Sequence, residues 1–287
     1  MLKPPKTIEE QIKLLEERGI IIDDYDFTKV FLENNNYYRL MGYAYQFKTE
    51  QEAYIENTKF ATIEKIYNFD RSLRQIIFPL LEALEISFRA KLAYFMCHKY
   101  GNEFYLKEKF FRNPEWYSDF MSAVERCIKQ SKSELFVKHH LAKYNGRFPF
   151  WVLIEILSFT TISKFFKNIN TADKNEFSRF YYKYDSIIFE NWIQHFSVLR
   201  NICAHYGRLY NKILFPTLKL LKEDNINRMM RIFDSLFILN KIFLDRFLWN
   251  DFLKKVDTVI TNNKDSIDLK LIGFSGDYLT KLGNNKN

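Results

Sequence analysis

The hydrophobic and polar positions recur with the period of an α-helix along most of the chain. The clearest run lies between Thr62 and Tyr100, where apolar residues are mostly three or four positions apart, with one gap of seven. They are Ile63, Ile66, Leu73, Ile77, Leu80, Leu84, Phe88, Leu92 and Phe95. We expect a long helix here that ends at Gly101-Asn102, and Pro79 should kink it or start a second helix.

The rest of the chain has the same character. Thr7, followed three positions later by Glu10, predicts a capped helix over 7–18. Other helices are expected near 26–34, 114–130, 133–144, 149–168, 172–183 (capped by Thr171), 186–206, 225–242 and 246–261. Residues 265–287 show little periodicity and predict an irregular tail with a frayed end. With only 8 Gly and 6 Pro and no alternating strand pattern, the predicted fold class is all-α.

Charge divides the chain into two parts. Residues 1–58 hold 7 Lys and Arg against 11 Asp and Glu, whereas residues 59–287 hold 36 against 24. We therefore predict an acidic N-terminal helical subdomain over 1–58 and a basic helical domain over 59–287 that includes the tail. A net charge of +12 on the larger part suits a phosphate-rich partner such as RNA, although an ordinary basic surface has the same charge.

Other features exclude several classes of protein. No uncharged apolar run reaches the roughly 18 residues that a membrane span needs, and the N-terminus lacks an apolar signal core, so a cytoplasmic protein without a membrane partner is expected. Three widely separated cysteines indicate reduced thiols rather than a disulfide framework. The chain has no glycine-rich phosphate loop, no HExxH and no zinc-ligand spacing, so neither a cofactor nor a metal is expected.

Unusual chemistry is concentrated in "SVLRNICAHYGRLYN", residues 197–211. On a helix, Asn201, His205 and Arg208 would form one polar stripe if the helix continued past Gly207, with Arg200 reaching toward the same end. Imidazole transfers protons near neutral pH, guanidinium binds phosphate oxygens, and the Asn201 amide could fix the His205 tautomer. These groups suit metal-independent cleavage of RNA, in which the 2′-OH attacks the neighbouring phosphate. An arginine and a histidine at this spacing also occur by chance in many helices.

The flanking residues add a resemblance. "LRNICAHYGRLYN" resembles the R-N-x-C-A-H-x-x-R-L-x-N signature of the AbiD/AbiF-like abortive-infection (Abi) proteins of the HEPN superfamily, whose hallmark is R-x4-6-H. The segments "NNNYYRLMGYAYQFK", "FDRSLRQIIFPLLEALEISFRAKLAYF", "FWVLIEILSFTTISKFFKNI" and "IGFSGDYLTKL" are similar to the same family. The resemblance implies a HEPN-type helical bundle with C-terminal helices, anti-phage activity and a site shared across a homodimer.

The resemblance also assigns residues. Arg200 and His205 match the hallmark pair and Asn201 the polar residue that follows its arginine, so these three are the expected catalytic residues. Tyr206 departs from the pattern, because a second histidine is frequent there. The resulting hypothesis is a metal-independent endoribonuclease acting on RNA.

Two alternatives remain open. An RNA-binding HEPN protein would hold a structured non-coding RNA without cleaving it, with phosphate contacts from Arg208, Lys212 and Lys219. Asn211, which like Arg208 matches a flanking position of the family signature, is a further expected RNA-binding residue. An adaptor protein would carry His205 as a packed core residue. Glu85 and Arg89, four residues apart, are interpreted as an ordinary helix ion pair rather than part of a site.

Overall fold

The computed structural model describes residues 4–50, 53–224 and 226–283. Within these ranges the chain forms α-helices, short 3₁₀ helices and no strand, which confirms the all-α prediction. The α-helices are α1 (Ile8–Glu17), α2 (Tyr25–Asn34), α3 (Tyr37–Ala44), α4 (Phe60–Tyr100), α5 (Pro114–Gln130), α6 (Leu135–Lys143), α7 (Phe150–Ile156), α8 (Phe159–Asn168), α9 (Thr171–Tyr182), α10 (Ser186–Ala204), α11 (Ile232–Ile242), α12 (Arg246–Thr261) and α13 (Tyr278–Gly283).

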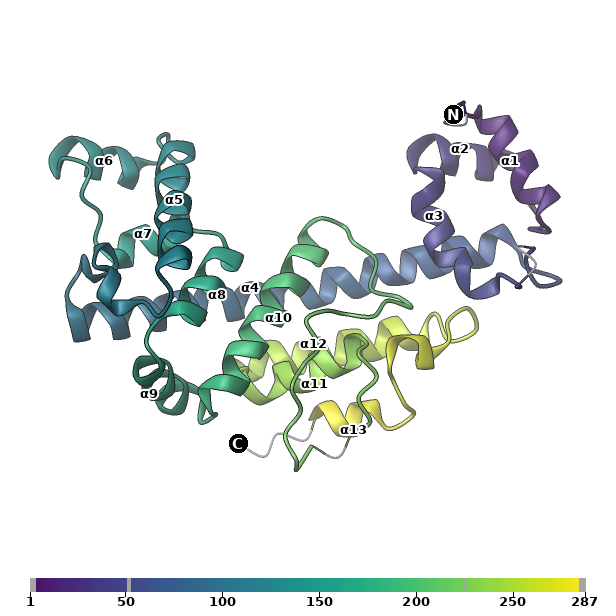
Figure 1. Ribbon diagram of the computed structural model, residues 1–287. Coiled ribbons are helices and arrows are strands. Elements are labelled where there is room, and N and C mark those ends of the chain that lie inside the picture. Colours follow the sequence, from purple (N-terminus) through teal and green to yellow (C-terminus); the bar gives the residue numbers. More distant parts are fainter. Residues whose placement is uncertain (1–3, 51–52, 225, 284–287) are drawn as a thin grey trace.

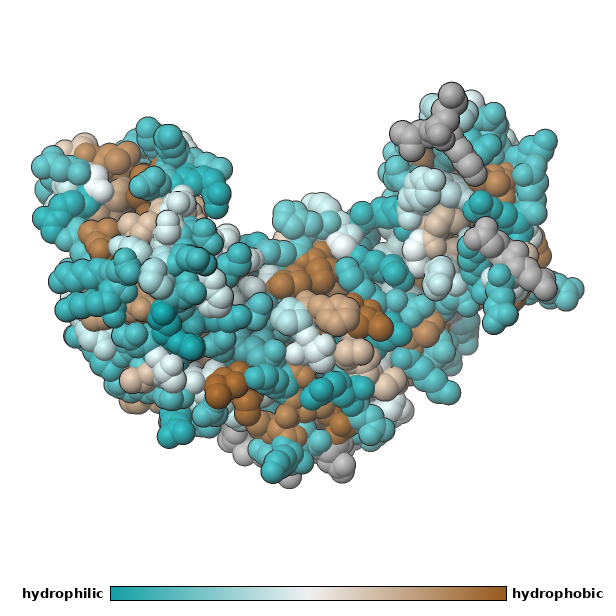
Figure 2. Space-filling model, in the orientation of Figure 1, coloured by the Kyte–Doolittle hydropathy of each residue, from teal (hydrophilic) through white to brown (hydrophobic). Residues whose placement is uncertain are grey.

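Helix α4 spans the length of the molecule and organises the other helices (Figure 1). Helices α1 to α3 form a lobe at its N-terminal end, α5 to α8 form a second lobe at its C-terminal end, and α10 and α12 pack against it between them. The apolar stripe of α4 is fully buried at Leu73, Leu80 and Phe88. The two lobes rise on the same side, so the surface between them is concave (Figure 2).

The first helix follows the prediction closely. The Thr7 side chain accepts a hydrogen bond from the Glu10 amide at 3.2 Å, and the Glu10 carboxylate accepts one from the Thr7 amide at 2.8 Å. These two bonds form the expected capping box and satisfy amides that have no partner inside the helix. Whether residues 1–58 are a separate subdomain stays a prediction.

Three expected helix boundaries differ from the structure. Helix α4 runs through Pro79 without a second start. The helix expected over 149–168 is two helices, because Leu157 is extended and the Ser158 hydroxyl caps α8 by accepting from the Thr161 amide. The helix expected from 225 begins only at Ile232, since the Asp234 carboxylate binds the backbone amides of the two preceding methionines and holds that segment as a loop.

The C-terminal tail is more ordered than the sequence predicted. It contains a 3₁₀ helix at Leu269–Ile272 and helix α13, and Phe274 and Leu282 are buried. The Leu282 carbonyl accepts hydrogen bonds from Asn240 at 2.9 Å and from the Trp249 indole at 3.0 Å. The prediction of an irregular tail was wrong, because the contacts that order the tail come from α11 and α12 and leave no local pattern in its sequence. The frayed end that was also expected lies outside the described residues.

No helix in the described ranges combines the length and apolar character needed to cross a bilayer. The three cysteines are free thiols. Cys203 is buried on α10, and this burial raises its pKa to about 12, so its thiol is protonated at neutral pH and packs as a small apolar side chain.

His195 ties α10 to the segments that follow it. Its Nδ1 donates a hydrogen bond to the Pro216 carbonyl at 2.7 Å, which leaves Nε2 to accept from the Ser235 hydroxyl at 2.8 Å. This neutral ring is buried, and burial lowers its pKa to about 4, whereas an unfolded histidine titrates near 6.5. Between these two values the unfolded chain binds a proton that the folded chain does not.

The stability of the protein is therefore expected to be highest above about pH 6.5 and to fall as the pH falls toward 4. The His195 contribution to this loss is about 2 kcal/mol between pH 7.5 and pH 5. Urea unfolding at both pH values measures it, with His195→Gln as the non-titrating control. An equal pH dependence in the wild type and in His195→Gln would show that His195 is not the source.

Candidate functional site

The motif segment begins on a helix and continues in a loop. Helix α10 ends at Ala204, and His205 is its C-cap. The Gly207 amide bonds the Ile202 carbonyl at 2.7 Å and the Tyr206 amide bonds the Cys203 carbonyl at 3.2 Å, which is the Schellman pattern. The expected stripe of Asn201, His205 and Arg208 on one helix face is therefore wrong, because Arg208 lies beyond the helix end.

Two residues fix this helix end. Tyr206 occupies the left-handed position at φ +58°, an uncommon conformation for a residue other than glycine, and its side chain is 70% exposed. A Cβ atom on Gly207 would lie 2.9 Å from Ile202 Cγ2, so only glycine fits where the chain turns back on the helix.

Arg200 contacts an acidic residue of α4. Its Nε lies 2.9 Å from Oε2 of Glu85, but the two groups are not aligned for a hydrogen bond, so the contact is an ion pair. Glu85 also pairs with Arg89, whose guanidinium in turn donates to the Ile154 carbonyl. The Glu85–Arg89 pair is thus more than the ordinary helix pair expected, because it holds the inner side of Arg200. The Arg200 side chain stays 33% exposed, so its contact with Glu85 does not enclose it.

The side chains of Asn201 and His205 form no hydrogen bond with each other. The Asn201 amide donates to the Thr160 hydroxyl of α8 at 3.0 Å, and its oxygen accepts from Arg200 at 3.4 Å. The prediction that Asn201 fixes the His205 ring is therefore wrong for this structure. His205 is exposed, and its ring forms no hydrogen bond or ion pair with the described residues. The core position that an adaptor protein would give His205 is not what the structure shows.

A buried acid of α4 holds the loop after α10. The Asp70 carboxylate has no exposed surface and accepts hydrogen bonds from the amides of Leu209 at 3.0 Å and Tyr210 at 2.7 Å. It also accepts from the Tyr43 hydroxyl at 2.6 Å and pairs with Arg74 one turn along α4. Burial next to this carboxylate raises the pKa of Tyr43, so its hydroxyl remains a donor.

Two arginines bind the same loop through its carbonyl groups. Arg74 donates to the Gly207 carbonyl at 3.3 Å, and Arg39 of α3 donates to the Tyr206 carbonyl. The loop that carries His205 is therefore fixed from α3 and α4 together. These contacts hold the backbone on both sides of the exposed imidazole, while the His205 ring itself has no bonding partner among the described residues.

The predicted RNA-contact residues differ in their surroundings. Arg208 donates to the carbonyls of Tyr210 and Asn211 at 3.0 and 3.3 Å, and its guanidinium carbon lies 6.0 Å from the centre of the Tyr43 ring. Asn211 accepts from Arg231 at 3.1 Å. Lys212 is partly exposed and pairs with no carboxylate in the described chain. Arg208 and Asn211 thus support the loop, and their contact with RNA stays a prediction.

The sequence alone did not single out four residues that hold this loop, which are Arg39, Tyr43, Asp70 and Arg74. Asp70 falls inside the gap of seven residues between Ile66 and Leu73, next to the buried Phe69 and itself at a core-facing position of α4. A charged residue at a core-facing helix position is rarely buried unless it is paired. The charge at this core-facing position was therefore the available signal for Asp70, which we call the anchor of the loop.

The end of α10 lies on the concave side of the molecule. Figure 1 shows α10 rising from α9 until its C-terminal end faces the space between the two lobes, where the surface in Figure 2 is hollowed. The described residues hold no group of three or more His, Cys, Asp or Glu side chains placed to bind a metal ion. The chemistry available here is that of an exposed imidazole and, five residues earlier on α10, a partly exposed arginine side chain.

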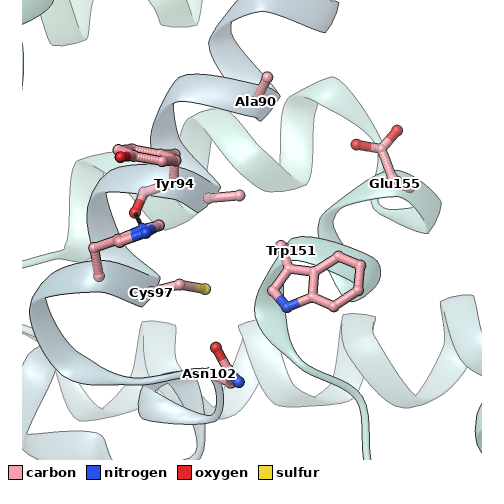
Figure 3. A pocket seen from close by; sticks show the side chains of 8 residues that line it. Ala90, Tyr94, Cys97, Asn102, Trp151 and Glu155 are labelled. Atoms are coloured by element: carbon pink, nitrogen blue, oxygen red, sulfur yellow. Dashed lines mark hydrogen bonds between the residues drawn. The ribbon is translucent and has the colours of Figure 1, made fainter.

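Two hollows of the surface differ in charge. The hollow of about 500 Å³ in Figure 3 lies between α4 and α7 and is lined by Tyr94, Trp151 and Glu155 but by no Lys or Arg. A second hollow of about 680 Å³ lies between α5, α8 and α10 and is lined by Arg126, Lys164 and Lys167 among its charged groups. The second is the one whose charge suits a phosphate.

Comparison with known proteins identifies the family but not an individual relative. Comparison with curated proteins found no match, and comparison with solved structures found none either. A model of the Abi-like protein family matches residues 30–211, a range that includes α3, the long helix α4 and the whole motif segment. The match covers more than half of the chain, so this protein belongs to the Abi-like family.

Proposed function

We propose that this Abi-like protein is a HEPN-type endoribonuclease that cleaves RNA without a metal ion during abortive infection, a response to phage. The observation that carries the proposal is the end of α10, where an exposed imidazole and a partly exposed arginine side chain lie five residues apart, about one and a half helical turns, and where α3 and α4 hold the loop backbone. The interpretation of the motif as R-x4-H and the flanking family segments support the same reaction. The membership of the Abi-like family points to phage defence.

The proposed reaction uses the ribose 2′-OH of the substrate. This hydroxyl attacks the adjacent phosphorus, the bond from phosphorus to the 5′-oxygen breaks, and the products are a 2′,3′-cyclic phosphate and a 5′-hydroxyl end. His205 accepts the proton of the 2′-OH, and Arg200 exchanges its contact with Glu85 for the phosphate oxygens, on which negative charge increases. DNA lacks the 2′-OH and is not cleaved by this route.

A homodimer belongs to the proposal because the leaving 5′-oxygen needs a proton. A second copy of the motif would place another His205 opposite the first, so that one imidazole accepts a proton and the other donates one. Apolar side chains near the motif are exposed and suit such a contact, with Phe215 63% and Ile213 43% exposed. Light scattering of the purified protein tests this part, and a monomeric mass at working concentration would contradict it.

The direct test is cleavage of total RNA and tRNA by the purified protein in the presence of EDTA. We expect the wild type to produce ends with 2′,3′-cyclic phosphate, and His205→Ala to produce none. His139→Ala is the matched control, since His139 is also exposed but lies on α6. Identical RNA after incubation with the wild type and with His205→Ala would refute the proposal for these substrates.

One observation favours a second function, in which the protein holds a structured non-coding RNA without cleaving it. Asn201 bonds Thr160 instead of His205, so the His205 ring lacks a partner among the described residues that would orient it for proton transfer. Sequencing of RNA that copurifies with the protein separates the two functions. One abundant intact species would support holding, whereas its absence together with EDTA-resistant cleavage would support the nuclease.

A further inference from the structure

A groove along α8 and α10 leads away from the motif. The hollow of about 680 Å³ between α5, α8 and α10 is lined by Thr160, which bonds Asn201 of the motif, and by Gln194. Gln194 lies seven residues before Asn201, so both project from the same face of α10. A smaller hollow of about 400 Å³ shares Gln194 and Lys167 with this hollow of about 680 Å³. The two hollows therefore form one continuous path that starts beside the motif.

The path is strongly basic. It is lined by six cationic side chains, from Arg112, Arg126, Lys164, Lys167, Lys174 and Lys219, against the two carboxylates of Asp119 and Glu190. Glu190 is already neutralised by Lys174, at 2.5 Å. None of the other five cations has a carboxylate within 4 Å in the described ranges, so their charge is not balanced inside the protein. Such a row of uncompensated cations attracts a polyanion.

An aromatic side chain stands in the same groove. Trp116 of α5 lines the larger hollow and is 43% exposed, and the Lys167 ammonium lies 5.2 Å from the centre of its ring. Phosphate-binding cations beside an exposed aromatic face are the combination with which proteins bind single-stranded nucleic acids, because an unpaired base can stack on the ring. In a duplex the bases are stacked on one another and cannot use it.

We propose that this groove binds the single-stranded part of an RNA on one side of the cleavage point and delivers the strand to the end of α10. The cations Arg112, Arg126, Lys164, Lys167 and Lys219 contact phosphates, and Trp116 stacks on a base. This inference deepens the proposed nuclease function and rests on it for the identity of the strand as RNA.

Binding is measured directly, without cleavage. The probe is a fluorescein-labelled, single-stranded 2′-O-methyl RNA of 12 nucleotides, which lacks the attacking hydroxyl, and the readout is fluorescence anisotropy across a salt series. Lys164→Gln with Lys167→Gln is expected to weaken binding about ten-fold at 0.15 M salt and to lower the slope of log K against log salt by about 1.4. Lys254→Gln with Lys264→Gln, two exposed lysines on and just after α12, is the matched control and should change neither.

The stacking contact has its own variants. Trp116→Ala is expected to weaken binding of the single strand roughly ten-fold, and Trp116→Phe is expected to restore most of it. A hairpin duplex of equal charge should be insensitive to Trp116→Ala. Equal loss for strand and hairpin, or no loss for the strand, would overturn the assignment to single strands.

The groove and the proposed function can fail separately. If the groove lysines do not affect binding while His205→Ala abolishes cleavage, the groove proposal is overturned and the nuclease stands. If the lysines and Trp116 control binding but wild type and His205→Ala cleave alike, the nuclease proposal fails and the groove remains a binding site for single strands.

Discussion

Replacing Asp70 with asparagine is expected to lower the free energy of unfolding by about 3–5 kcal/mol. The substitution keeps the shape of the side chain but removes the charge that balances Arg74, which is also buried. It also turns an acceptor for the amides of Leu209 and Tyr210 into a group that can accept through one oxygen only. Because a whole domain is stable by about 5–15 kcal/mol, urea unfolding should show a large shift of the midpoint.

The control for this prediction is Asp251→Asn. Asp251 forms the same kind of pair, four residues before Lys255 on α12, but both side chains are exposed. Its loss is expected to cost less than about 1 kcal/mol. Hydrogen exchange adds a local readout, because the amides of Leu209 and Tyr210 should exchange faster in Asp70→Asn even where the protein is still folded. Equal destabilisation by the two substitutions would show that Asp70 is not an anchor.

The contacts of Asp70 and Arg39 join the beginning of the family match, on α3 and α4, to its end, the loop after α10. Asp70 is 139 residues before Leu209 in the sequence, yet the two are hydrogen bonded. Arg39, which is 167 residues before Tyr206, binds the carbonyl of that residue. We infer that α3 and α4 belong to the same site as the motif, because they set the conformation of the loop that carries His205.

Local patterns in the sequence predicted most helices, since a helix depends on residues three and four positions apart. The capping box at Thr7 and the long periodic run of α4 are examples. The end of α10 was not predicted, because Tyr206 adopts a left-handed conformation that its own side chain does not favour. The contacts of Arg39, Arg74 and Asp70 with this loop compensate that conformation, and none of them is local in sequence.

The candidate site contains residues that the sequence could predict and residues that it could not. Arg200 and His205 were identified by residue type and by the family resemblance. The role of Glu85 beside Arg200 was not, since the pair with Arg89 satisfied every local expectation and the contact with α10 exists only in the folded protein. The basic groove was missed for a similar reason, because its cations come from helices α5, α8 and α9 and from the segments before α5 and after α10.

Replacing Arg200 with alanine is expected to lower the rate of RNA cleavage at least 100-fold, which is the usual effect of losing one donor to the developing charge. Its effect on stability should be small, about 1 kcal/mol or less, because the side chain is partly exposed and Glu85 keeps its pair with Arg89. Arg200→Lys keeps the charge but loses the planar fork, so only partial activity should return. Rates come from single-turnover cleavage of a defined RNA in EDTA, and stability comes from urea unfolding of the same preparations.

The double variant Arg200→Ala with His205→Ala tests whether the two residues act as one unit. If the guanidinium and the imidazole stabilise the same transition state as a unit, the double variant should cleave RNA only slightly more slowly than the slower single variant. Once one of the two groups is lost, the other contributes little to the rate. If the two residues contributed independently, the fold losses in rate of the two single variants would multiply in the double variant. Wild-type cleavage by Arg200→Ala, or destabilisation as large as that of Asp70→Asn, would instead assign Arg200 a structural role, with Glu85 and Arg200 joining α4 to α10 much as Asp70 joins α4 to the loop.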